Sequence, residues 1–346
     1  MPRIKGEKGF FVPSDTVPHL SHISTKWPLF LLLCSAASAD HLYEPRHDST
    51  ILAAMDQIFR MDYAAADIAL KRIPDNAAAK PYFSGIVCMN RFQDLGDTSA
   101  LQRAEFFWTQ LNAEKSGAFP NENGARLDTY HGLALMQLSY ISSLRGERFH
   151  SAKLAFSAHS QFDGSNMAEA RAGAALFEYY RGRLLSSIPL VEPNLNVPMQ
   201  RLQVAADSSR YLRDLLRSSL FWMRVDHGEA DSALRIPDEF LKRYPRNRLA
   251  RQMRGSGLFR AGKLSEARLI YEELLQEYAL LNLSTSKNLP LGYYKAAGNL
   301  ARIYSGLGLK HEASAKLALW QKALDSGLSP WLPATLKRDL ERLKKP

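Results

Sequence analysis

Cysteine is nearly absent from this sequence. Only Cys34 and Cys88 occur among its 346 residues. If an N-terminal segment up to residue 39 is removed, Cys88 alone remains and the mature chain has no internal disulfide. The fold must then be held together by side-chain packing alone.

The motifs of common catalytic and metal sites are also absent. The sequence has no His-Glu-x-x-His pair, no Gly-x-Ser-x-Gly, no phosphate-binding loop and no zinc-finger spacing. Cys88 lies among apolar residues, which predicts a buried, unreactive thiol. We therefore expect no metal, no cofactor and no enzymatic activity. An enzyme whose catalytic residues lie far apart in the sequence is left as an alternative.

Long apolar runs are lacking too, and one short run is informative. Residues 27–37 are apolar, follow Lys26 and end in Ala37-Ser38-Ala39 before a polar residue. The run is shorter than the about 20 residues that a membrane-spanning helix needs. Small residues at Ala37 and Ala39 match the preference of signal peptidase. We expect a leader and signal peptide at 1–39 and export to the bacterial periplasm or cell envelope. The alternative is a buried helix of the mature fold.

Basic residues exceed acidic ones, 45 to 35. The formal net charge is +10, with 46% hydrophobic and 23% charged residues, which is typical of a globular protein with a basic surface. The basic residues are scattered, and the basic C-terminal stretch 337–345 also carries acids. This pattern does not favour nucleic-acid binding. It is compatible with anionic protein partners and with peripheral membrane association.

Beyond residue 48 the chain is rich in Ala, Leu, Arg, Glu and Gln, with apolar residues three and four apart, which predicts helix almost throughout. Glycines mark regular breaks between amphipathic stretches. Gly146 and Gly182 are 36 residues apart, and Gly228 and Gly262 are 34 apart. The steps from Gly182 to Gly228 and from Gly262 to Gly308 are 46, which equals 34 plus the 12 residues of an insert. The expected inserts are 188–198 and 282–290.

Side chains at fixed distances from these glycines repeat. Around Gly262 they are Gly255, Leu258, Ala267 and Tyr271; around Gly308 they are Ala301, Tyr304, Ala313 and Leu317; after Gly228 they are Ala233, Phe240 and Pro245. This pattern resembles the tetratricopeptide repeat (TPR) family, here of an exported bacterial type. The match is good for 208–324 and looser before, where the turn at Arg60–Tyr63 lacks a glycine and Gly96 marks a further pair.

The resemblance implies an all-α fold: a right-handed α-solenoid of about seven antiparallel helix pairs, ending in a capping helix at 333–344. The expected division is a leader at 1–39, divergent TPR-like pairs at 40–145, and TPR-like repeats with the cap at 146–346. A generic helical bundle is the alternative, against which the regular 34-residue step argues. Whether 40–145 continue the same superhelix is left open.

In the TPR family the first helix of each pair lines a concave groove. Counting from the repeat positions, we expect the groove to present Tyr140, Glu169, Tyr179, Trp222, Gln252, Phe259, Lys295 and Arg302. Aromatic side chains with a few charges are typical of a protein or peptide site. Lys295 and Arg302, seven residues apart on one helix face, are placed to bind a carboxylate.

The function we expect is therefore that of a non-catalytic scaffold or adaptor that binds another exported protein or peptide in the cell envelope. The first alternative is a module that binds glycan or cell-wall material, for which Tyr and Trp in the groove are suited. An enzyme with a dispersed site is the less favoured alternative.

Overall fold

The computed structural model describes residues 42, 45–113, 118–120, 122–186, 188, 190–282, 289–325 and 334–343. All of these belong to one compact unit, Ala39–Pro346. The signal-peptide prediction, with its cleavage residues Ala37 and Ala39, lies outside the described residues.

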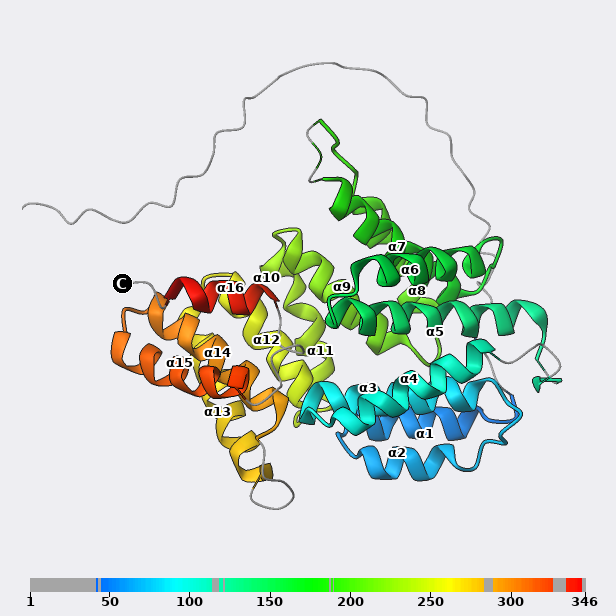
Figure 1. The fold of residues 1–346 in the computed structure, drawn as a ribbon, viewed down its shortest axis with the longest axis horizontal. Coiled ribbons are helices and arrows are strands. Elements are labelled where there is room, and N and C mark those ends of the chain that lie inside the picture. Colours follow the sequence, from blue (N-terminus) through cyan, green and yellow to red (C-terminus); the bar gives the residue numbers. More distant parts are fainter. Residues whose placement is uncertain are drawn as a thin grey trace, which may run out of the picture. The chain divides into compact units, whose positions relative to one another are not determined.

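The described residues form helices and connecting turns without a strand, so the predicted all-α class is confirmed (Figure 1). The helices are α1 (Asp48–Phe59), α2 (Tyr63–Leu70), α3 (Ala79–Leu95), α4 (Thr98–Ala113), α5 (Gly124–Leu144), α6 (Arg148–Phe162), α7 (Ala168–Leu185), α8 (Asn196–Ser208), α9 (Arg213–Asp226), α10 (Ala230–Ala233), α11 (Arg235–Arg243), α12 (Arg248–Arg260), α13 (Leu264–Asn282), α14 (Leu291–Gly306), α15 (Lys310–Asp325) and α16 (Ala334–Leu343). Across these ranges, no helix combines the length and apolarity that crossing a bilayer requires.

Successive helices pack in pairs along the chain, as the TPR-like pattern predicts. In the described part of the chain the pairs are α1/α2, α3/α4, α5/α6, α7/α8, α9 with α10 and α11, α12/α13 and α14/α15. The cap α16 then packs on α14 and buries Leu340. The chain is an all-α solenoid, and its first two pairs continue into α5 in chain order.

Turns between paired helices use a left-handed residue, as expected. Gly262 and Gly308 both have φ of 76°, and Gly146 and Gly228 have 82° and 91°. Only glycine adopts this conformation without a steric cost. In the first pair, which lacks the glycine, Met61 takes the same role with φ of 66°.

The predicted break at Gly182 is wrong. Gly182 lies inside α7, which continues to Leu185. A Cβ atom at this position would come within 2.7 Å of the Leu195 side chain. The glycine is therefore required for close packing against the segment before α8, and sequence alone does not distinguish that role from a turn.

The small and large positions of the repeat pack as predicted. Ala267 and Tyr271 on α13 are fully buried, and a Cβ at Gly255 would lie 2.7 Å from the Tyr271 ring. Ala301 and Ala313 are buried in the next pair. Small residues thus allow α12 and α13 to approach, and the large ones fill the space between them.

The sequence did not predict one feature: helices far apart in the chain also pack together. α3 packs against α14. Phe59, at the end of α1, meets the Phe240 ring of α11 with centroids 5.1 Å apart, and its carbonyl accepts a 2.7 Å hydrogen bond from the Asn247 amide. Asp48 pairs with Arg210. The first two pairs therefore contact the later ones directly, in addition to their neighbours.

Substitution of a turn glycine tests the role of the left-handed conformation. Gly262→Ala forces φ of 76° on a residue with a Cβ, and we expect it to lower the free energy of unfolding by about 1 kcal/mol. Urea denaturation monitored by circular dichroism measures this. Gly124→Ala is the matched control, because its Cβ would meet nothing within 4 Å at the start of α5. Equal losses in both variants would contradict the assignment.

Candidate functional site

A cavity of about 530 Å³ opens among the first helices of the pairs. It receives side chains from α3, α5, α9, α12 and α14, each the first helix of its pair, and from the ends of α1 and α11. Its lining comprises Phe59, Asn90, Gln93, Tyr140, Leu215, Ser218, Trp222, Val225, Asp226, Phe240, Asn247, Leu249, Ala250, Gln252, Met253, Ser256, Phe259, Arg260, Lys295, Asn299 and Arg302. We call it the first-helix cavity.

The lining combines aromatic rings, amides and cationic groups. Lys295, Arg302 and Arg260 carry positive charge, whereas Asp226 is the one carboxylate among the described lining residues. Asp226 lies 3.9 Å from Arg260, so its charge is partly compensated. The remaining charge of the cavity is positive, which favours an anionic ligand group.

Lys295 and Arg302 project from α14 two turns apart. The Arg302 guanidinium lies over the Phe259 ring, 4.4 Å from its centroid, which favours this position of the cation in the cavity wall. The Lys295 ammonium donates a 3.4 Å hydrogen bond to the Gln93 carbonyl oxygen. No carboxylate of a described residue comes within 4.0 Å of it.

Burial lowers the pKa of Lys295 to about 8, and the nearby charge of Asp94 opposes part of this effect. A desolvated ammonium without a carboxylate partner is costly to keep charged, so an entering anion gains from neutralising it.

Six of the eight residues predicted for the groove line this one cavity: Tyr140, Trp222, Gln252, Phe259, Lys295 and Arg302. They come from four different helices, α5, α9, α12 and α14. The repeat pattern therefore identified side chains that are up to 162 residues apart in sequence and that line the same cavity.

The other two, Glu169 and Tyr179, are fully buried in the body of the solenoid. Glu169 accepts hydrogen bonds from the Ser209 hydroxyl at 2.5 Å and the Leu42 amide at 2.9 Å. The Tyr179 hydroxyl donates to the Met223 carbonyl at 2.9 Å. Both side chains join α7 to other segments and are not accessible to a ligand. Because α7 runs past Gly182, the register that the sequence assigned to this helix does not hold.

Several lining residues were not predicted. Asn299 lies between Lys295 and Arg302 on the same face of α14, and this spacing was a usable signal. Asn90 and Gln93 come from α3, which lies across the cavity from α14 only because the distant pairs pack together. No repeat position could reveal them.

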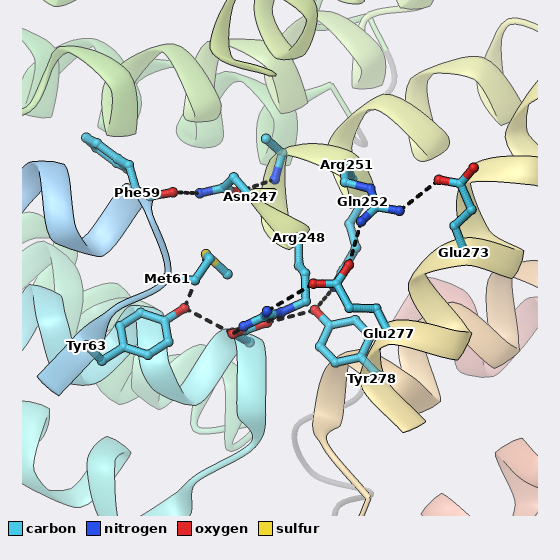
Figure 2. Close-up of polar contacts among 12 residues, drawn as sticks. Phe59, Met61, Tyr63, Asn247, Arg248, Arg251, Gln252, Glu273, Glu277 and Tyr278 are labelled. Atoms are coloured by element: carbon cyan, nitrogen blue, oxygen red, sulfur yellow. Dashed lines mark hydrogen bonds and ion pairs between the residues drawn. The ribbon is translucent and has the colours of Figure 1, made fainter. Parts of the chain in front are cut away.

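Beside the cavity, Asp94 at the end of α3 forms a buried polar cluster, whose partners Tyr63, Arg248 and Tyr278 are labelled in Figure 2. Its carboxylate accepts two hydrogen bonds from Arg248 of α12, at 3.0 and 2.5 Å. The hydroxyls of Tyr63 and Tyr278 donate to it at 3.2 and 2.8 Å. Burial, reinforced by the charge of Asp94, raises the pKa of both tyrosines, so both hydroxyls stay protonated as donors.

The Asp94 cluster extends outward and reaches the cavity. Arg248 also pairs with Glu277 at 3.2 Å, and Arg251 bridges Glu277 at 2.5 Å and Glu273 at 2.9 Å. On the cavity side, the Gln252 amide donates a 2.7 Å hydrogen bond to the Tyr278 hydroxyl. The cluster thus fixes α3, α12 and α13 relative to one another at one side of the first-helix cavity (Figure 2).

Within the described ranges, no group of three or more His, Cys, Asp or Glu side chains is arranged to hold a metal ion. Cys88 is buried, and burial raises the pKa of its thiol to about 11. The predicted buried thiol is confirmed, and at neutral pH it is not ionised.

No family model matches the sequence, and no curated protein matches it. Among solved structures, a tetratricopeptide repeat protein from Parabacteroides merdae is similar, with 17% sequence identity and a TM-score of 0.37. The match covers 86% of this chain and 98% of that chain.

Removal of the Asp94 carboxylate tests the cluster. Asp94→Ala leaves Arg248 buried with only Glu277 as partner, and we expect the free energy of unfolding to fall by about 3 kcal/mol. Asp94→Leu/Arg248→Leu removes both charges and should recover part of the loss. Urea denaturation provides the measurement.

The matched control is Asp75→Ala, which breaks the ion pair with Lys80 at a carboxylate that is 97% exposed. This exposed pair should contribute less than about 1 kcal/mol. If Asp94→Ala and Asp75→Ala lowered the free energy of unfolding by similar amounts, burial would not increase the contribution of the Asp94 cluster to stability.

Proposed function

We propose that this chain is a non-catalytic TPR-like scaffold that binds an acidic, extended segment of another exported protein in the first-helix cavity. The observation that carries the proposal is the convergence of Lys295 and Arg302 with aromatic and amide side chains from several first helices. The fold supports an interaction role, and the lining chemistry supports this class of ligand.

The lining suits a short peptide segment. The amide groups of Asn90, Gln252 and Asn299 each donate one hydrogen bond within the protein, and the second N–H of each can donate to a peptide backbone. Trp222 and Tyr140, each 44% exposed, offer aromatic surface to side chains. A volume of about 530 Å³ accommodates a few residues, so a chain end or a short linear segment fits better than a whole helix.

The absence of catalysis is part of the proposal. Asp226 is the sole carboxylate of the described lining, and it faces Arg260. The two lining serine hydroxyls are engaged elsewhere: Ser218 donates to the Asp214 carbonyl, and Ser256 bonds to the Tyr271 hydroxyl. Neither has a general base of the kind that nucleophilic catalysis requires.

We place the protein in the bacterial periplasm or cell envelope. This part of the proposal rests on the sequence alone, namely the apolar run at 27–37 and the small residues Ala37 and Ala39. The partner would then be another envelope protein.

A glycan ligand is the second candidate. Exposed aromatic rings such as Trp222, together with a set of amides, also suit stacking and hydrogen bonding to sugars. A neutral glycan would make little use of the positive charges of Lys295 and Arg302, and this difference separates the two candidates.

Charge reversal tests the acidic ligand. Fluorescent acidic hexapeptides, with a charge-neutral series and peptidoglycan fragments as further probes, are titrated by fluorescence polarisation. We expect Lys295→Glu/Arg302→Glu to weaken binding of the acidic peptides by about tenfold or more, because attraction at two positions becomes repulsion.

The control is Arg246→Glu/Lys310→Glu, which makes the same charge change at exposed positions outside the cavity lining. If both variants weakened acidic-peptide binding equally, the effect would come from the overall charge of the protein, which would contradict binding in the cavity. The glycan candidate would be favoured if the protein bound peptidoglycan fragments but not acidic peptides, and if neither variant changed its affinity for the fragments.

The titration of Lys295 gives a pH dependence. Its pKa of about 8 means that the ammonium is charged at neutral pH and becomes neutral above about pH 8. An anion binds the charged form, so we expect affinity for acidic peptides to fall as the pH rises from about 7 to about 9. Lys295→Arg keeps the charge and should flatten the profile. A wild-type profile that is already flat would contradict the role of Lys295.

A further inference from the structure

Large apolar side chains gather on α6 and at the end of α7, outside the first-helix cavity. Phe149 is 94% exposed, Phe156 60% and Leu184 74%. Beyond α7, Ile188 and Leu190 are also exposed. Such residues are usually buried, and several together on one surface mark an interaction site.

The exposed apolar side chains of α6 and α7 are aligned along the two helices, and Ile188 and Leu190 follow the end of α7 in the chain. Phe149 and Phe156 are seven residues apart on one face of α6, and Phe177 and Leu184 are seven apart on one face of α7. The Phe156 and Phe177 rings touch, with centroids 5.1 Å apart. Because the two helices run antiparallel, Phe149 lies level with Leu184.

We call Phe149, Phe156, Leu184, Ile188 and Leu190 the α6–α7 strip. In Figure 1 the end of α7 and the green segment after it project beyond the neighbouring helices. Their exposed fractions range from 49% for Ile188 to 103% for Leu190, and none of them belongs to the cavity lining. The strip is therefore a separate, protruding apolar surface.

Basic residues border the α6–α7 strip. Arg148, Lys153 and Arg181 are exposed and form no ion pair with a described residue, and the Arg181 guanidinium lies 5.7 Å from the centroid of the Phe177 ring. Arg183 is 4.0 Å from Asp226. The exposed acids of the described segments from Glu147 to Glu192 are Glu147, Asp163 and Glu192, so positive charge predominates around the strip.

We infer that the α6–α7 strip docks on the surface of an anionic lipid membrane. A protruding apolar edge enters the headgroup region without needing a complementary groove, and basic residues beside it attract the anionic headgroups. The charge complementarity of the border selects this occupant over a second copy of the chain, which would bring like charges together. The inference is independent of the proposed cavity function.

Vesicle sedimentation tests it with the full chain. The probes are phosphatidylcholine vesicles with and without phosphatidylglycerol at about one third of the lipid. We expect the wild-type chain to bind the anionic vesicles. The variant Phe149→Ser/Leu184→Ser/Leu190→Ser should bind them about tenfold or more weakly. Arg148→Glu/Lys153→Glu/Arg181→Glu should weaken binding by about fivefold or more for each charge.

The matched control is Phe106→Ser/Leu269→Ser/Leu280→Ser, which changes the same residue types at positions that are 62%, 54% and 68% exposed on other helices. It should bind like the wild type. All variants keep residues 27–37, so any binding by that apolar run is common to them, and circular dichroism verifies the fold of each.

Three results would overturn the inference. The wild type does not bind anionic vesicles, the strip variant binds them as well as the wild type does, or the strip and control variants lose the same amount of vesicle binding. A strip variant that changes the mass in solution without any vesicle binding would assign the surface to self-association, and would equally overturn it.

Discussion

The contact between Asp94 and Arg248 joins residues 154 apart in sequence, and the arrangement of the site depends on it. In a solenoid whose pairs contact only their neighbours, the second pair (α3/α4) does not contact the sixth (α12/α13). A fully buried carboxylate with a bidentate guanidinium partner and two tyrosine donors requires that arrangement, because separation would leave a charge in an apolar interior. The same packing sets α3 across from α14, and the first-helix cavity lies among these helices.

Much of the fold follows from local chemistry that sequence reveals. Gly262 and Gly308 form left-handed turns, Ala267 and Ala301 are buried where helices approach, and α16 caps the last pair. Gly182 was misassigned because a glycine required for close packing and one required for a turn are the same residue type. The contacts between distant pairs were missed for a different reason. Asp94 and Arg248 each resemble an ordinary charged residue on a helix, and a repeat pattern describes only neighbouring units.

The candidate site was predicted in part for the same reasons. Repeat positions identify which face of a first helix points inward, and that was sufficient for Lys295, Arg302 and four others. They do not tell whether an inward side chain meets a ligand or another helix. Glu169 and Tyr179 have residue types suited to a binding groove, yet both satisfy buried hydrogen-bonding groups. Asn90 and Gln93 needed knowledge of the long-range packing. Side-chain type therefore identified candidates, and only tertiary structure distinguished those that line the cavity from those that are buried.

The packing of α3 on α14 also bears on how such a chain can change over time. An open repeat array tolerates the gain or loss of a unit, because each unit rests on its neighbours alone. Here an extra helix pair inserted between Asp94 and Arg248 would displace the guanidinium from its carboxylate and move the two walls of the cavity out of register. The number of helix pairs between Asp94 and Arg248 is thus tied to this one contact, whereas a connection outside the helices, such as the one between α7 and α8, carries no such constraint.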